Sequence, residues 1–243
     1  MSHQPNVFSP PGTPLLDRTV GELVAERPGR SRVFHSYNID FCCQGGRTLR
    51  EACARKGLTS DLVVEQLEAE LADPSPPARN PANLPPAELA AYIVETHHGF
   101  LRRELPRLHA MSERVAQVHG GHTPALVEMF HVFIGMEAEL TGHMLKEEQI
   151  LFPAVVALTL GGPAPGSLEG PIACMIHEHE EVGAALDRLR ELSHGFKPSP
   201  DACNTYRALF AGLSDLEQDV HRHVHLENAV LLPAARKLAE KSR

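Results

Sequence analysis

Two stretches of the chain repeat one pattern: HMLKEEQILFP at residues 143–153 and HVHLENAVLLP at residues 223–233. Both read H-x-x-x-E-x-x-x-L-x-P. Residues four apart lie one turn apart on the same face of an α-helix, so each stretch places an imidazole beside a carboxylate. Apolar residues share that face in both repeats, which indicates that the two polar side chains point into a helical core.

The repeats fall in the second and fourth of four long segments whose apolar residues recur at helical spacing. Gly- and Pro-rich breaks separate these segments, and no strand-like alternation intervenes. We predict helices at residues 87–117, 125–158, 171–193 and 202–240. Long helices joined by short breaks pack most simply as an antiparallel four-helix bundle, so the predicted fold class is all-α.

Proline and glycine also divide the part of the chain that precedes the bundle. We expect a Pro-rich arm at residues 1–16 and a small domain of short helices at 17–72, which contains adjacent cysteines. A stiff linker at 73–86 follows, with six prolines in fourteen residues. The bundle then occupies residues 87–243.

Composition narrows the possible partners. The chain has 23 Lys and Arg against 31 Asp and Glu, a net charge of −8, and no long basic run, so neither nucleic acid nor an anionic membrane is expected as a partner. No stretch approaches the ~20 apolar residues of a membrane span, and the first residues lack the order of a signal peptide. We therefore expect a cytoplasmic protein.

The first and third predicted helices each contain a histidine that matches the repeats. His98 precedes His143 by 45 residues, and His179 precedes His223 by 44. Four imidazoles and two carboxylates would then meet on one axis. Buried carboxylates must be paired or neutralised, and this mixed set suits two divalent metal ions, iron first, with zinc and manganese possible. The predicted ligands are His98, His143, Glu147, His179, His223 and Glu227.

Each element has a plainer reading. One H-x-x-x-E pair can be a surface pair, and one inward histidine can be a hydrogen-bonded core residue. The motif occurs twice, each time with a histidine 44 or 45 residues before it, and this repetition argues against both of these interpretations. Neighbouring residues differ by ~100° around a helix, so only one of His97 and His98 is expected to face inward, and His97 stays an alternative. Glu139 and Glu178 are candidates for carboxylates just outside the metal ligands, with a solvated helix face as the alternative.

Other residues beside the repeats are expected to have no role at the metal. His221 and His225 are expected to be exposed, as are three basic residues: Arg102, Arg103 and Lys146. The isolated cysteines are expected to be small buried hydrophobes: Cys53, Cys174 and Cys203.

The adjacent pair Cys42 and Cys43 is of a different kind. Neighbouring Cα atoms are only ~3.8 Å apart, below the usual separation in a disulfide, so a bond between the two thiols would be strained. Glycines end the turn that carries them, which favours exposure. The pair could bind iron through sulfur, exchange nitric oxide or link two chains; alternatively, it could pack against the short helices.

Several stretches of the chain resemble a known family. The repeats at residues 143–153 and 223–233 resemble the hemerythrin-like bundle of the Repair of Iron Centres (ScdA-type) proteins, and TVGELVAERPGRSRVFHSYNIDFCCQGGRTLREA resembles their N-terminal cysteine domain. PAELAAYIVETHH and the following RRELP match the family's first bundle helix at His98. Gln44 departs from the glycine that usually follows the paired cysteines.

The resemblance implies a cofactor of two iron ions with oxo and carboxylate bridges, held by the six predicted ligands. It also implies a role in restoring iron-sulfur clusters damaged by nitric oxide or oxidants, with Cys42 and Cys43 as candidates for thiol transfer. Partners would then be damaged iron-sulfur proteins and small ligands such as nitric oxide or those derived from O2, and a homodimer is plausible. Two other functions use the same centre: reduction of nitric oxide or peroxide, and sensing of O2 or nitric oxide.

Overall fold

The computed structural model describes residues 9–10, 12–71, 80–162 and 166–242. All regular secondary structure in these ranges is helical, and the one extended feature is an isolated bridge between Thr19 and Thr48. The all-α prediction is therefore confirmed. Much of the predicted arm at 1–16 and linker at 73–86 lies outside the described residues, which omit 1–8, 11 and 72–79.

The chain forms two compact units. The central unit comprises residues 92–154 and 168–220, and the terminal unit comprises the described residues of 1–91, 155–167 and 221–243. The unit boundaries pass through long helices, so residues of the predicted bundle occur in both units.

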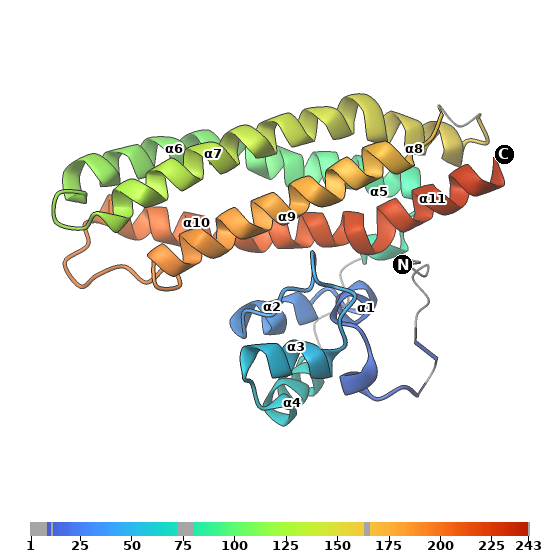
Figure 1. Cartoon of the computed structure of the whole chain (residues 1–243), viewed down its shortest axis with the longest axis horizontal. Helices are drawn as coiled ribbons and strands as arrows, with labels where there is room; N and C mark the ends of the chain where they lie inside the picture. Colours follow the sequence, from blue (N-terminus) through green and yellow to red (C-terminus); the bar gives the residue numbers. More distant parts are fainter. Residues whose placement is uncertain (1–8, 11, 72–79, 163–165, 243) are drawn as a thin grey trace. The chain divides into compact units, whose positions relative to one another are not determined.

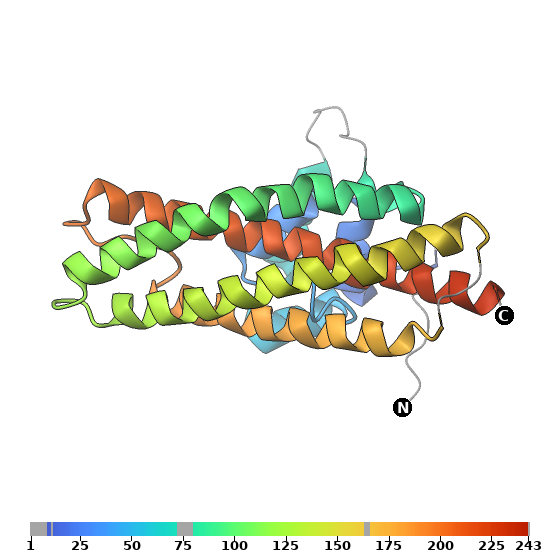
Figure 2. The same cartoon turned by 90° about the horizontal axis from the view of Figure 1, so that it is seen from above.

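The central unit contains long helices that lie side by side (Figures 1 and 2). They are α6 (Gly99–His119), α7 (Ala125–Lys146), α9 (Glu169–Leu192) and the first part of α10 (Asn204–Leu226). Helix α7 packs against α6 and α9. The predicted four-helix bundle is thus present. When the turns and shorter helices that continue them are included, the helical segments run over 86–119, 125–159, 169–192 and 204–241, within a few residues of the predicted bounds.

Contacts from α10 close the bundle. Arg190 on α9 donates from Nε to Glu217 Oε1 on α10 at 2.7 Å. On the other side, Gly212 of α10 lies so close to α6 that an added Cβ would be 2.6 Å from Leu108 Cδ2. The interior between the helices is aliphatic and fully buried at such residues as Leu101 and Leu216.

Within the described ranges, three π-helical turns interrupt the long helices, and none of them was predicted from the sequence. They are η3 (Val94–His98) between α5 (Pro86–Ile93) and α6, η4 (Glu147–Leu151) between α7 and α8 (Phe152–Thr159), and η5 (Glu227–Leu231) between α10 and α11 (Leu232–Lys241). In the last two, the peptide N–H groups of Phe152 and Leu232 donate to carbonyls five residues earlier, those of Glu147 and Glu227.

The prolines of the repeated motif lie close to η4 and η5, whereas Pro106 lies within α6, which is α-helical throughout. Pro153 and Pro233 each follow one residue after a π turn. A proline inside a helix lacks an N–H, and its ring clashes with the carbonyl four residues earlier. A wider turn just before the proline relieves that clash, and π turns are frequent at functional sites. Each of these π turns thus begins at a motif carboxylate and ends at the motif leucine, two positions before the proline.

The terminal unit contains the short helices of the N-terminal region: η1 (Leu15–Asp17), α1 (Val20–Glu26), α2 (Arg30–Ser36), α3 (Leu49–Lys56), α4 (Ser60–Leu71) and η2 (Pro81–Asn83). Capping boxes begin α1 and α3: Thr19 pairs with Glu22, and Thr48 with Glu51. Their core is apolar, with Leu23 and Phe34 fully buried. Across the described residues, none of the helices combines the length and apolarity that crossing a bilayer requires.

Candidate metal centre

Glu147 is the carboxylate around which the predicted metal ligands of the central unit gather. It begins the π turn η4 and is 0% exposed. Its Oε1 atom lies 3.3 Å from His143 Nε2, and its Oε2 atom lies 3.2 Å from His98 Nε2. His179 Nε2 lies 3.1 Å from His143 Nε2. One carboxylate therefore faces two separate groups of imidazoles, one with each oxygen.

These separations fit donor atoms of shared metal ions. Metal–nitrogen and metal–oxygen bonds of about 2.1 Å would place donors 3.1–3.3 Å apart at about 95–105° around one ion. The ligand atoms of His143, Glu147 and His179 all lie within 4.8 Å of one another. Imidazole and carboxylate together are donors that iron accepts. The residues present thus fit a bound metal, and they form a His/Glu cluster of the kind the sequence predicted.

A second carboxylate orients His143. The Nδ1–H of His143 donates to Glu178 Oε2 at 2.9 Å, and Lys146 donates to the other oxygen of Glu178. Burial opposes ionisation of Glu178, but the hydrogen bonds from Lys146 and His143 outweigh it and lower its pKa to about 2. With the proton held on Nδ1, the Nε2 lone pair of His143 is available to a metal ion. Lys146 is exposed, as predicted.

His98 has an equivalent partner that the sequence analysis missed. Its Nδ1–H donates to Glu148 Oε1 at 2.6 Å, and Arg102 donates to both oxygens of Glu148 at 2.7 and 2.8 Å. Burial again opposes ionisation, but Arg102 and His98 lower the pKa of Glu148. His143 and His98 thus each donate to a carboxylate, and each carboxylate also accepts a hydrogen bond from an exposed basic residue.

The remaining motif pair lies in the terminal unit. His223 Nε2 is 3.1 Å from Glu227 Oε1, and both side chains are buried, with Glu227 0% exposed. Glu227 begins η5 as Glu147 begins η4. Neither motif carboxylate faces solvent, which agrees with the prediction that both repeats point into a core.

The expectation that only one of His97 and His98 faces inward is wrong, because both are buried. They lie in the π turn η3, where the wider turn changes the angular spacing that the α-helical prediction assumed. Only His98 has a nitrogen beside Glu147. His97 instead donates from Nδ1 to Asp219 of α10, whose two oxygens are both 3.1 Å away.

Two further expectations are corrected. Glu139 is exposed rather than close to the metal ligands, because it lies roughly 90° around α7 from the mean direction of the buried side chains. His225 is 3% exposed rather than solvated, and its Nδ1–H donates to the carbonyl of Phe41 at 3.4 Å. Burial lowers the pKa of His225 to about 4. His221 is half-buried, with its ring against that of Phe41.

The cysteines differ from expectation in three places. Cys42 is buried rather than exposed, and Cys43 is half-buried. The neighbouring Cys43 thiol, burial and the Asp40 carboxylate together raise the pKa of Cys42 well above its usual value. Cys53 is buried as predicted, but Cys174 and Cys203 are exposed. Cys174 lies 3.2 Å from Glu178, and Cys203 lies 3.4 Å from His119.

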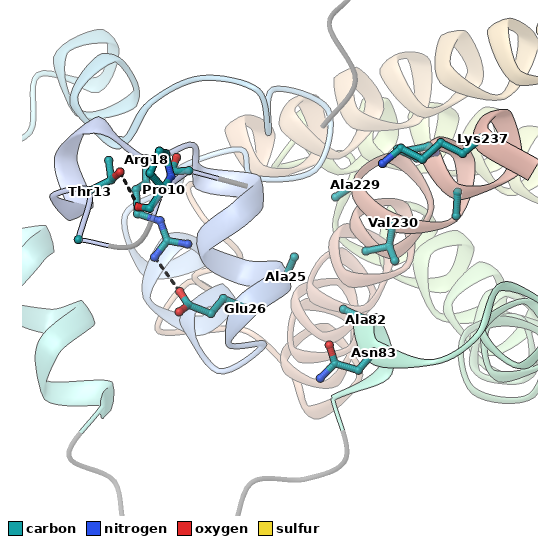
Figure 3. Close-up of a pocket in the computed structure, with 14 residues that line it drawn as sticks. Pro10, Thr13, Arg18, Ala25, Glu26, Ala82, Asn83, Ala229, Val230 and Lys237 are labelled. Atoms are coloured by element: carbon teal, nitrogen blue, oxygen red, sulfur yellow. Dashed lines mark hydrogen bonds and ion pairs between the residues drawn. The ribbon is translucent and has the colours of Figure 1, made fainter. Parts of the chain in front are cut away.

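The terminal unit also has a cavity of about 730 Å³ (Figure 3). Arg18, which is paired with Glu26 at 2.9 Å, lines it together with Asn83 and Lys237. Figure 3 shows the Arg18–Glu26 pair on α1 and its flanking segment, with Lys237 on a separate helix. None of the predicted metal ligands lines this cavity, so it is separate from the metal-binding residues.

Comparison with known proteins agrees with this geometry. The ScdA_N family, described as a domain of unknown function (DUF542), matches residues 16–71, and the hemerythrin HHE cation binding domain matches residues 89–235. Three similar relatives are each named iron-sulfur cluster repair protein YtfE. Those of Pectobacterium carotovorum (strain PC1), Edwardsiella ictaluri and Escherichia coli (strain SMS-3-5) are 37%, 41% and 35% identical to this chain. Each match covers 90% of this chain and 96% of the relative.

Proposed function

The chain belongs to the hemerythrin HHE family and to the family of its YtfE relatives, and from that premise we propose that it repairs iron-sulfur clusters damaged by nitric oxide or oxidants. In this proposal it holds two iron ions among the buried histidines and glutamates and supplies iron to damaged cytoplasmic proteins. The name of the relatives supports the repair function, and the buried His/Glu cluster supports the binding of metal.

The observation that carries the proposal is the position of Glu147. Its two oxygens face different imidazoles, His143 on one side and His98 on the other. A carboxylate placed in this way suits a bridge between two ions rather than a ligand of one. We assign His143 and His179 to one ion on the basis of their facing Nε2 atoms.

The second motif completes the proposed ligand set. We propose that His223 and Glu227 complete the six ligands, with Glu227 as the counterpart of Glu147 in the second repeat. Two facts support this assignment: the repeated motif begins a π turn at Glu227 as it does at Glu147, and the hemerythrin match from 89 to 235 includes all six residues. Both carboxylates are 0% exposed, and pairing with cations is what makes such burial tolerable.

When bound, the two iron ions supply exchangeable metal and a redox couple. The protein's own residues determine how firmly the metal is held. Glu178 and Glu148 keep the protons of His143 and His98 on Nδ1, and so keep Nε2 available. Both carboxylates are half-buried, so solvent reaches them although it does not reach the histidines that they bind. A change in solvent pH can therefore act on His143 and His98 through these hydrogen bonds.

Contacts in the terminal unit link the paired cysteines to the second motif. Asn228, the residue after Glu227, donates from Nδ2 to the carbonyl of Cys42 at 3.3 Å. His225 donates to the carbonyl of Phe41, on the other side of the same turn. The thiols are thereby held beside the helix that carries a proposed iron ligand, which supports their participation in iron transfer.

The test uses a four-iron-cluster hydro-lyase inactivated with nitric oxide. The iron-loaded full chain should restore its activity, whereas the variant Glu147→Ala with Glu227→Ala, given the same total iron, should not. A chelator in both reactions removes free iron as a source. The repair proposal is contradicted if the two proteins restore activity equally. Consumption of nitric oxide over many turnovers without restored activity would instead favour a reductase.

A further inference from the structure

The turn between α2 and α3 contains a compact group of metal-binding side chains outside the proposed iron site. Asp40, Cys42 and Cys43 each offer a ligand atom within 4.8 Å of the other two. The two Sγ atoms are 3.8 Å apart, and Cys42 Sγ lies 3.2 Å from Asp40 Oδ1. All three residues belong to the terminal unit.

The sulfur separation distinguishes between classes of metal ion. With metal–sulfur bonds of about 2.3 Å, tetrahedral coordination places two sulfurs about 3.8 Å apart, whereas linear two-coordination places them about 4.6 Å apart. The observed 3.8 Å matches the tetrahedral value without movement of either side chain. Two thiolates and a carboxylate are also donors that divalent zinc and iron accept in tetrahedral sites.

We propose that Asp40, Cys42 and Cys43 form a second metal site, which binds one tetrahedral divalent cation, Zn(II) or Fe(II), and leaves its fourth position open. The site would bind iron during its transfer to a recipient protein, and this role rests on the proposed function. Cation binding itself does not depend on that function, and the bundle ligands, which include no sulfur, do not contribute to it.

The backbone of the turn is fixed in advance. Asp40 Oδ1 accepts the N–H groups of Cys42 and Cys43 at 3.0 and 2.9 Å. Glycine at 45 is required, since a Cβ there would lie 2.6 Å from the carbonyl oxygen of Phe41. Asn228 and His225 bind the carbonyls of Cys42 and Phe41. A site whose ligands are already held loses little conformational entropy when the cation binds.

The half-buried state of two ligands gives the cation a route of entry. Asp40 and Cys43 are both partly accessible, while Cys42 is buried beneath them. A ligand exchange partner, such as a thiolate of a recipient protein, could therefore reach the open position on this side. This accessibility contrasts with the bundle residues Glu147 and Glu227, which are both 0% exposed.

Cobalt(II) titration of the reduced full chain, without oxygen, tests the proposal. Thiolate ligands give cobalt an intense sulfur-to-metal charge-transfer absorption, which the histidine and glutamate ligands of the bundle cannot produce. At saturation we expect the intensity of this absorption to correspond to one thiolate-bound cobalt per chain. Cys43→Ser and Cys42→Ala should each abolish it, and Asp40→Asn should weaken cobalt binding at least about 10-fold.

Control variants identify the source of the signal. Cys53→Ser, in the same unit but outside the cluster, and the exposed pair Cys174→Ser with Cys203→Ser should all retain the absorption. Circular dichroism of each variant should match that of the wild type, as a check that the variant is folded. The proposal is overturned if the absorption is absent, if it survives in Cys43→Ser, or if the Cys174/Cys203 variant loses it. Since the cluster-repair assay measures iron from the bundle, its failure and the failure of this test are separate results.

Discussion

Replacing His98 with alanine should remove bound metal, whereas replacing the adjacent His97 should leave it in place. His98 Nε2 is 3.2 Å from the shared carboxylate of Glu147, so its loss removes a metal ligand. Loss of even an outer partner of a ligand costs 10–100-fold in metal affinity. We therefore expect at least about 100-fold weaker binding for His98→Ala, which corresponds to about 2.7 kcal/mol.

His97→Ala should act on stability instead. It removes a buried hydrogen bond to the Asp219 carboxylate, which holds His97 with both oxygens at 3.1 Å. Buried hydrogen bonds to charged groups contribute about 1.5–3 kcal/mol, so we expect the free energy of unfolding to fall by about 2 kcal/mol. For a chain of this size, that corresponds to a Tm lower by about 4–8 °C.

The assay compares iron content per folded chain after gel filtration with urea unfolding of the metal-free proteins. His177→Ala, on the exposed side of α9 with a side chain 70% exposed, is the matched control and should match the wild type in both measurements. If His97→Ala loses iron and His98→Ala keeps it, the assignment of the ligand is reversed. If both variants keep iron, neither histidine is a ligand and the first helix takes no part in the site.

Three further predictions concern residues around the site and in the terminal unit. Glu178→Ala and Glu148→Ala should each weaken metal binding about 10–100-fold in a chelator competition, while the exposed Glu139→Ala should not; equal effects of all three would contradict the role of the two carboxylates. Burial opposes ionisation of Glu22, but hydrogen bonds from the backbone N–H groups of Thr19 and Ser9 outweigh it and lower its pKa below 4.5. Its ionised form therefore stabilises the fold above about pH 4.5, and the stability gap between the metal-free wild type and Glu22→Gln should be present at pH 7 and shrink as pH falls through the folded-state pKa; a gap that is constant with pH would contradict this. Gly45→Ala should lower the free energy of unfolding by about 1–3 kcal/mol because its Cβ would lie 2.6 Å from the Phe41 carbonyl oxygen, whereas Gly46→Ala, with nothing within 4 Å of its Cβ, should be neutral in the same urea titration.

The parts of the fold that the sequence predicted are those set by local spacing. Apolar residues three and four apart gave the long helices and their order, and the i, i+4 spacing placed His143 beside Glu147 and His223 beside Glu227. The capping residues Thr19 and Thr48 likewise act within one turn of the chain. Such features depend on residues a few positions apart, so they are visible in the sequence.

The missed features depend on contacts between distant parts of the chain. His97 and Asp219 are 122 residues apart, and His98 and Glu148 are 50 apart, so helical spacing says nothing about either pair. The burial of His225 likewise follows from its contact with Phe41, 184 residues away. The prolines of the two L-x-P motifs accompany two of the π turns, but a proline alone does not predict such a turn, because Pro106 lies within α6, which has none.

The most direct test of the central idea is an anomalous difference map at the iron absorption edge, from crystals of the iron-loaded full chain. Two peaks should be present, with Glu147 bound to both, His143 and His179 bound to one of them, and the other proposed ligands also bound: His98, His223 and Glu227. A single peak, or two peaks that share neither carboxylate, would contradict the proposed two-iron site.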